Sequence, residues 1–177
     1  MSSMSDNRFV AEQYRLHGQK VFKRCLAMTG GEAALAADVT QDVFVRLVEK
    51  ARTLDCSSSL EGWLLTVAYR LCCQRLRRDR ILWRRVCVAL AAQPSAEAAP
   101  AREPRVPGGG VALGARMASS LRTLPPKERA ALLMRYMDDL PQTQIAKALG
   151  YSEGYVSKLL SRGTERLRAL DWETDDD

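Results

Sequence analysis

Residues 142–160 of the sequence are QTQIAKALGYSEGYVSKLL. Apolar residues recur at helical spacing on both sides of Gly150, which predicts two amphipathic helices. Gly150 supplies a stop for the first helix, and Ser152 is a suitable N-cap for the second. The residues spaced to pack the two helices across the short turn are Ile145, Ala146, Leu149, Val156 and Leu160. The segment therefore predicts a helix-turn-helix.

The second of these helices is predicted from Glu153 to about Leu170. A helix-turn-helix reads duplex DNA by laying its second helix in the major groove, where side chains near the helix N-terminus reach the bases. The side chains predicted to contact DNA are Ser152, Tyr155, Ser157, Lys158 and Arg162. The alternative is that the cations Lys158, Arg162, Arg166 and Arg168 form only the solvated side of a terminal helix.

Further towards the N-terminus, Pro126–Met137 is predicted to be a helix, and Pro141 stands where a first-turn proline is tolerated. Between Gln93 and Gly114 the composition changes, because four of the seven prolines fall there and Gly108–Gly110 follow them. Such a stretch cannot hold a regular helix or bury much apolar area. We expect a flexible linker between two folded halves, and no strands in either half.

The first half is predicted to contain three helices. Arg8–Met28 forms the first, Gly30-Gly31 breaks the chain, and Glu32 to about Ala51 forms the second. The second helix should bury Leu35, Val39, Val43, Phe44 and Leu47, and expose Asp38, Gln41, Asp42, Val45 and Glu49. Ser58 and Glu61 are spaced as a capping box for a third helix. That helix should bury Trp63, Leu64, Val67, Ala68 and Leu71, and its later part is strongly basic, with Arg75, Arg77, Arg78, Arg80, Arg84 and Arg85.

The charge balance points to a polyanionic partner. The chain has 177 residues, with 27 Lys and Arg against 21 Asp and Glu, and five of those acids lie in the last seven residues. Without this tail sixteen acids remain, so the body carries a balance of +11. Nucleic acid is the commonest partner of so basic a body. The alternative is a basic surface that is merely solvated.

The five cysteines form no C-x-x-C pair, and with a single histidine they do not make a zinc site. We expect reduced thiols in a cytosolic protein, with Cys72 and Cys73 serving as small buried residues. No stretch has the apolar length of a membrane span, and residues 1–7 lack the apolar core of a signal peptide. Export and membrane anchoring are therefore disfavoured.

Two sets of motifs resemble the extracytoplasmic-function (ECF) sigma factors of bacterial RNA polymerase. In the first half, ADVTQDVFVRL at residues 37–47 is similar to the acidic D-x-x-Q-x-x-F helix of sigma region 2, and WLLTVA at 63–68 with LRR at 76–78 is similar to its W-L-x-x-I-A…L-R-R helix. In the second half, Leu124-Pro125, the QIA of 144–146 and the LGYS of 149–152 resemble region 4. The resemblance implies an all-α fold of two small helical domains joined by a flexible linker. It places region 2 at 8–88, the linker at 89–115, region 4 at 116–170 and an acidic tail at 171–177.

The resemblance also implies partners and residue roles. Region 2 would bind the clamp helices of the largest polymerase subunit, and region 4 the flap of the second largest. The residues implied for polymerase binding are Asp38, Gln41, Asp42, Val45 and Glu49. Those implied for the unwound minus-ten element are Ser57, Ser58, Arg70, Gln74, Arg77 and Arg78. Those implied for the minus-thirty-five duplex are Ser152, Tyr155, Ser157, Lys158, Ser161 and Arg162. An anti-sigma protein is a further implied partner.

The sequence departs from the family pattern at DNA-reading positions. The third helix carries Arg70 and Gln74 where an Asn and an Asp are usual, and Ser157, Lys158 and Leu159 stand where Lys, Ser and Arg are common. The polymerase-binding face matches the family pattern better than the DNA-reading residues do.

Two other functions remain open from the sequence. A free-standing helix-turn-helix regulator would bind duplex DNA alone, usually as a dimer on two half-sites. A thiol enzyme or redox sensor would use Cys72 and Cys73, but no His or Asn constellation supports it. The chain has no phosphate-binding glycine loop and no carboxylate set for two metals, so we expect neither a catalytic site nor a metal or other cofactor.

Overall fold

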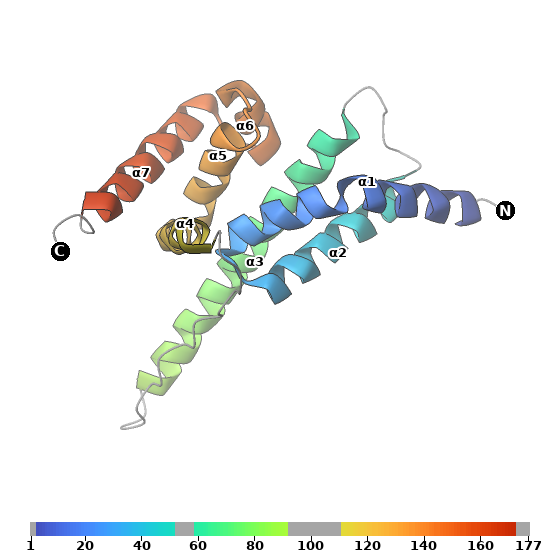
Figure 1. Cartoon of the computed structure of the whole chain (residues 1–177). Helices are drawn as coiled ribbons and strands as arrows, with labels where there is room; N and C mark the ends of the chain where they lie inside the picture. Colours follow the sequence, from blue (N-terminus) through green and yellow to red (C-terminus); the bar gives the residue numbers. More distant parts are fainter. Residues whose placement is uncertain (1–2, 52–58, 92–110, 173–177) are drawn as a thin grey trace.

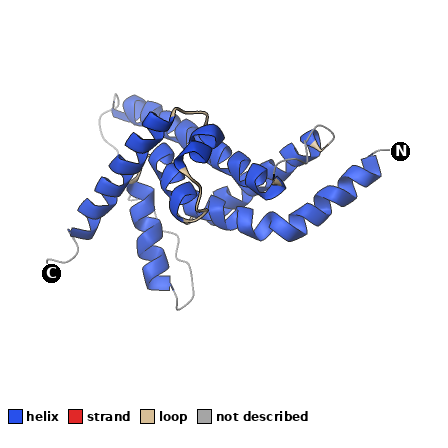
Figure 2. Cartoon of the chain, turned by 90° about the horizontal axis from the view of Figure 1, so that it is seen from above, coloured by secondary structure: helices blue, strands red, loops and turns tan. Residues whose placement is uncertain are grey.

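The structure is a computed structural model that describes residues 3–51, 59–91 and 111–172. All the regular elements within these ranges are helices, as Figure 2 shows, which confirms the predicted all-α class. The helices are α1 (Ser3–Thr29), α2 (Ala33–Lys50), α3 (Leu60–Ala91), α4 (Val111–Thr123), α5 (Pro126–Tyr136), α6 (Gln142–Leu149) and α7 (Glu153–Trp172).

In the first half, α1 and α2 form a helical hairpin that packs on α3 (Figure 1). Gly30 and Gly31 join the hairpin with φ of 69° and 92°, and their amides bond back to the carbonyls of Ala27 and Leu26. Glycine adopts such angles without the steric cost that a Cβ brings, so the predicted break follows from these two residues. Of the apolar residues predicted to face inward on α2, Val39, Val43, Phe44 and Leu47 are buried, while Leu35 is partly buried.

The start of α3 differs from the prediction. Ser58 lies outside the described residues, and the helix begins at Leu60 with the Ser59 hydroxyl accepting a hydrogen bond of 3.4 Å from the Gly62 amide. Glu61 instead pairs with Lys20 of α1. The predicted capping box thus lies partly outside the described residues; among the described ones, Ser59 is the cap and Glu61 joins α3 to α1. Further along α3, Leu64, Ala68 and Leu71 are buried as predicted, and Trp63 and Val67 are partly buried against the core.

The sequence did not predict α4. The expected linker extends to Gly114, but helix α4 begins at Val111. Most of the expected linker, residues 92–110, lies outside the described residues. The end of the linker was misplaced because the apolar residues after Gly110 start a helix that buries Leu121.

In the second half, α6 and α7 form the predicted helix-turn-helix on α5. Gly150 ends α6 with φ of 73°, and the amide of Tyr155 donates to the Ser152 hydroxyl at 3.3 Å, so the predicted stop and N-cap are both confirmed. Ile145, Ala146 and Val156 are buried between the helices. Leu160 is only partly buried, and Leu159 is the better buried of the two.

The two halves pack against each other. Helix α5 contacts α1 and α3, α6 contacts α3, and α4 contacts α1 (Figure 1). The Arg129 side chain of α5 is buried and donates hydrogen bonds to the carbonyls of Met28 at the end of α1 and of Arg122 and Leu124. Carbonyls at a helix C-terminus carry partial negative charge, which favours a cation there. The described halves thus share one continuous apolar core.

Candidate functional site

Helix α2 presents the acidic and amide face predicted for polymerase binding. Asp38, Gln41 and Glu49 are exposed, and they alternate along the helix with the buried residues. Asp42 is half-buried and forms an ion pair of 2.7 Å with Arg75 of α3. The α2 face therefore combines exposed polar groups with one carboxylate that is held against the basic helix.

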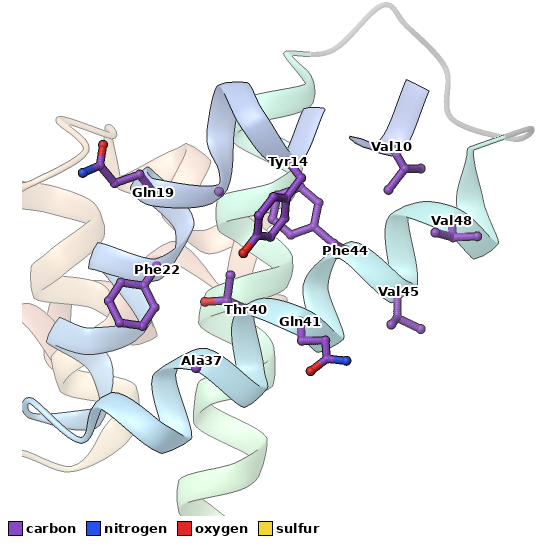
Figure 3. A pocket seen from close by; sticks show the side chains of 11 residues that line it. Val10, Tyr14, Gln19, Phe22, Ala37, Thr40, Gln41, Phe44, Val45 and Val48 are labelled. Carbon is purple, nitrogen blue, oxygen red and sulfur yellow. The ribbon is translucent and has the colours of Figure 1, made fainter. Parts of the chain in front are cut away.

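A groove of about 820 Å³ runs between α1 and α2 beside this face (Figure 3). Val45 and Val48 of α2 line it and are 49% and 45% exposed. Tyr14 of α1 also lines it, is 54% exposed and lies edge-on against Phe44, with ring centroids 4.8 Å apart. Exposed apolar side chains gathered around a groove mark an interaction surface more strongly than scattered ones do.

The sequence reasoning identified only the α2 wall of this groove. The α1 wall is formed by Val10, Tyr14, Gly18, Gln19 and Phe22. These residues follow helical spacing, so by pattern alone they belong to an ordinary core stripe. What distinguishes them is that α2 does not cover them fully, and that depends on the packing of the two helices.

The basic face of α3 was predicted to bind the minus-ten element. Ser57 and Ser58 lie outside the described residues, and Arg77 and Arg78 are exposed. Arg70 is directed at the second half, where its guanidinium donates to the carbonyl of Ala148 at 2.6 Å and to that of Lys147 at 3.4 Å. Of the predicted minus-ten residues that the structure describes, Arg77 and Arg78 therefore face solvent, while Arg70 contacts the C-terminal end of α6.

Helix α7 displays the predicted minus-thirty-five residues. Ser157, Lys158, Ser161 and Arg162 are exposed, with pairs four residues apart that share a face of the helix. Ser152 is exposed, and its hydroxyl is engaged as the N-cap. Leu159, which stands where the family often has Arg, is 4% exposed and belongs to the core.

A second cavity, of about 380 Å³, lies between α3 of the first half and α5 and α7 of the second. Gln74 and Arg77 line one side, and Tyr155 and Arg162 line the other. Lys127 also lines it, with its ammonium 4.9 Å from the centre of the Tyr151 ring and 5.7 Å from that of Tyr155. The hydrogen bond with Tyr151 raises the pKa of Lys127, so this cation stays charged beside the rings.

Three of the cysteines lie in the interior. Cys25 and Cys72 are fully buried free thiols on α1 and α3, and Cys73 is half-buried with its thiol 3.5 Å from the Pro126 carbonyl. The hydrogen bond with Cys25, together with burial, raises the pKa of Cys72, and burial raises the pKa of Cys73 to about 11. A reactive cysteine needs a lowered pKa and access to solvent, so the predicted role as small buried residues fits and the thiol-enzyme alternative loses support.

Within the described ranges, no three His, Cys, Asp or Glu side chains gather in a way that would hold a metal ion. None of the helices in the same ranges is both long and apolar enough to cross a membrane.

Comparisons with known proteins match both halves of the chain. Residues 13–81 match the family model of Sigma-70 region 2, and residues 120–169 match that of Sigma-70, region 4. The order is that expected from the motifs, and the matched segments contain α2, most of α3, the whole of α5 and α6, and most of α7.

Relatives resemble the chain over most of its length. The ECF RNA polymerase sigma factor SigE of Mycolicibacterium smegmatis is 28% identical over 89% of this chain, which spans 59% of SigE. SigW of Bacillus subtilis, also an ECF sigma factor, is 24% identical over 92% of this chain and 89% of its own length. The sigma factor RpoE of Bartonella quintana, solved with the anti-sigma factor NepR, shares the fold with a TM-score of 0.62 and 18% identity, over 93% of this chain and 97% of RpoE. With region 2 in its first half and region 4 in its second, the chain belongs to the sigma-70 family of sigma factors.

Proposed function

We propose that this chain is a sigma factor of the ECF type, which binds core RNA polymerase and directs initiation at a specific set of promoters. The observation that carries the proposal is the presence of both family regions in one chain, with an exposed α2 face in the first and an exposed recognition helix in the second. A free-standing regulator of the helix-turn-helix type would need only the helix-turn-helix of the second half.

The α2 face and the groove beside it are the proposed contact with the clamp helices of the largest subunit. Asp38, Gln41 and Glu49 would pair with basic groups of the clamp. Val45 would add apolar contact at the groove wall, and Asp42 would act while paired with Arg75. The groove widens the predicted site to include Tyr14 and Val48, which are exposed and apolar.

The basic face of α3 is the proposed site for the unwound minus-ten strand. Single-stranded DNA is held by cations along its backbone and by contacts to extruded bases. Arg77 and Arg78 are exposed cations, while Gln74 and Arg70 offer amide and guanidinium donors. Ser57 and Ser58 complete the predicted set.

Helix α7 is the proposed reader of the minus-thirty-five duplex. Lys158 and Arg162 would neutralise phosphates, while Ser157 and Ser161 on the exposed face would reach base edges or phosphates. Ser152 and Tyr155 lie at the N-terminal end of α7. This is the end of a recognition helix that contacts base edges in the major groove. The second half would also contact the flap of the second-largest subunit.

The chain would supply specificity and leave nucleotide addition to the polymerase, in the cytoplasm where polymerase works. An anti-sigma protein is a proposed regulator, since the Bartonella quintana relative was solved with one. Such a protein would act by covering surfaces that polymerase needs.

The test is run-off transcription with core polymerase on fragmented genomic DNA of the source organism, with the 5′ ends of the transcripts sequenced. We expect a small set of start sites that share upstream elements and appear only when this protein is added. Gel-shift measurements on the same fragments with the protein alone should show weak binding. Tight, sequence-specific binding without polymerase, combined with no new start sites, would instead identify a free-standing regulator.

A further inference from the structure

The cavity between α3, α5 and α7 is large enough to hold a small molecule. Its volume is about 380 Å³, within the range of about 300–1,000 Å³ that is typical of ligand pockets. Three separate stretches of the chain line it: Cys73, Gln74 and Arg77 on α3, residues 125–128 at the start of α5, and Tyr151, Tyr155, Leu159 and Arg162 in the turn before α7 and on α7. Leu159 and two prolines supply apolar surface, and most of the other side chains are polar or aromatic.

The charges that line the cavity are unbalanced. The lining holds three cations, Arg77, Lys127 and Arg162, and one carboxylate, that of Glu128. This carboxylate is already paired, because it lies 3.2 Å from Nε of Arg166, which does not line the cavity. No ion pair between described residues involves any of the three cations. Charges of one sign gathered in a cleft concentrate ions of the opposite sign, so the cavity favours an anion that carries several charges.

Two tyrosine rings line the cavity beside these cations. The rings of Tyr151 and Tyr155 pack edge to face, with centroids 5.1 Å apart and an interplanar angle of 76°. The ammonium of Lys127 lies 4.9 Å from one centroid and 5.7 Å from the other. Tyr155 is 36% exposed, so part of its ring is open to a ligand. A heteroaromatic base can stack on such a ring while neighbouring cations bind the phosphates.

The combination of groups suits a nucleotide better than a simpler ligand. A single phosphate carries at most about two negative charges, so a diphosphate matches three cations better. The amide of Gln74, on the same helix as Arg77, offers both a donor and an acceptor, which suits the edge of a base. An inorganic anion would use the cations and leave the rings and the amide without a partner, and a nucleoside would do the reverse.

We propose that this cavity is a binding site for a free nucleoside diphosphate, in which Arg77, Lys127 and Arg162 bind the phosphates and Tyr155 stacks on the base. All of these groups belong to this chain, so binding requires neither polymerase nor promoter. Because Arg77 and Arg162 are also proposed to contact DNA, a bound nucleotide would compete with a DNA strand for them. Only this competition, and not the site itself, rests on the proposed function.

Isothermal titration calorimetry of the full-length chain with ADP and with GDP tests the site. We expect at least one of them to form a one-to-one complex with a Kd below about 100 µM, which is within reach of a ligand of this size. Pyrophosphate and adenosine, which each carry part of the chemistry, should bind at least about tenfold more weakly. Equal affinity for pyrophosphate would identify a plain anion site, and failure of both nucleotides to bind would identify none. Either result would overturn the proposal.

Two substitutions, each with a matched control, locate the binding. Arg162→Gln should weaken nucleotide binding by at least about tenfold, because a charged phosphate contact is lost. Arg168→Gln is its control, since Arg168 is exposed on the same helix and does not line the cavity. Tyr155→Leu removes the stacking surface and should weaken binding by about five- to tenfold. Its control is Tyr136→Leu, since Tyr136 is 68% exposed on α5, outside the cavity.

We expect both control variants to bind the nucleotide as the unmodified chain does. All four side chains are exposed, so the variants should fold, which far-UV circular dichroism checks. Equal losses within each pair would show that general surface charge and apolar surface govern binding, and would overturn the proposal.

A labelled DNA strand of about five nucleotides, followed by fluorescence anisotropy, separates this site from the proposed DNA contacts. We expect the nucleotide to displace the strand from the protein. A nucleotide that binds in the calorimeter but displaces no strand would support the cavity site and contradict the DNA roles of Arg77 and Arg162. A strand that binds more tightly than both nucleotides, and loses that affinity in Arg162→Gln and Tyr155→Leu, would show that the cavity holds single-stranded DNA, and the proposal would be wrong.

Discussion

Gly163 sets how closely α7 approaches α5. A Cβ at this position would lie 2.7 Å from Cδ1 and 3.2 Å from Cγ of Leu132, closer than side chains normally pack. Gly163 is buried in the middle of α7, and its helical backbone does not require glycine. The close contact with Leu132 requires a residue without a side chain. The contact joins the recognition helix to the helix that carries it.

We predict that Gly163→Ala destabilises the folded chain by about 1–2 kcal/mol, because overpacking the α5–α7 contact outweighs the gain in helix propensity. Gly154→Ala is the control, since a Cβ there meets nothing within 4 Å and the helix should gain up to about 1 kcal/mol. Urea unfolding followed by circular dichroism measures both. Equal effects of the two substitutions would show that the close approach is not tight.

The buried thiols lead to a prediction about reactivity. Burial raises the pKa of Cys73 from its ordinary value of 9.0 to about 11, so its thiolate fraction at pH 8 is about 100-fold below that of a free thiol. In a chain carrying Cys56→Ser and Cys87→Ser, labelling of Cys73 with a disulfide reagent, followed by mass spectrometry of its peptide, should be at least about 100-fold slower than labelling of glutathione. The labelling rate should increase as the pH rises towards 11. In urea it should equal the rate for glutathione. Fast labelling of the folded chain at pH 8 would revive the redox alternative.

At the scale of single residues, burial and capping could be predicted from the sequence where the contacts of a residue lie on its own helix or on the next one. The buried stripe of Val39, Val43 and Leu47 and the cap at Ser152 follow from local spacing and local hydrogen bonds. Asp138 was not identified, because its partner Arg24 stands 114 positions away and nothing near Asp138 in the sequence indicates burial. A carboxylate in a turn is ordinarily solvated.

The groove between α1 and α2 carries a prediction at the scale of elements. Val45→Lys places a charge on the groove wall, and we expect the affinity for core polymerase to fall by about tenfold, since roughly 1.4 kcal/mol of apolar contact would be lost. The stability of the folded chain should change by less than about 0.5 kcal/mol, because the side chain is exposed. Fluorescence anisotropy of labelled protein titrated with core polymerase measures the affinity.

Leu16→Lys is its control. Leu16 is 65% exposed on α1 and does not line the groove, so the same change of chemistry should leave polymerase affinity unaltered. If both substitutions weaken binding equally, general surface charge rather than the groove governs the interaction.

Helix α7 carries the next prediction. Lys158→Ala should weaken binding of the polymerase-bound chain to its promoters by about three- to tenfold and reduce the slope of log affinity against log salt by about one, since one phosphate contact is lost. Arg168→Ala is the comparison, because Arg168 is exposed on the same helix but lies ten residues beyond Lys158, away from the N-terminal end that a recognition helix inserts into the groove. Filter binding at several salt concentrations provides the measurement, and an equal loss for both variants would support a merely solvated basic face.

Most elements were predictable because their ends carry local signals. Gly150 and the glycine pair at 30–31 adopt positive φ, and each ends a helix where the sequence indicated. Helix α4 was missed because the glycines and prolines before it dominate the composition of that window. The cap of α3 was hard to assign because three consecutive serines, at 57–59, precede the helix. In the structure the Ser59 hydroxyl accepts from the Gly62 amide, and Glu61 pairs with Lys20 of α1.

For the whole molecule, the relative placement of the halves was not readable from the sequence. The contacts that join the halves are pairs far apart in the chain, such as Arg129 with the Met28 carbonyl, and no local pattern in the sequence indicates them. Because the two halves belong to one chain, their contacts form at a high effective concentration. One such contact is the buried ion pair of Arg24 in the first half with Asp138 in the second, at 2.7 Å.

The continuous core leads to a prediction about unfolding. Each half alone is small and buries a limited share of its apolar surface, whereas the whole chain adds the contacts of α5 and α6 with α1 and α3. We therefore expect differential scanning calorimetry of the unmodified chain to show one transition whose calorimetric and van't Hoff enthalpies agree. Asp138→Asn should uncouple the halves and give two transitions, the lower of them below the single wild-type midpoint, while Asp139→Asn, which removes the same charge at an exposed position, should keep one. Two transitions in the unmodified chain would mean that the halves unfold independently and that the contacts between them add little to the stability of either.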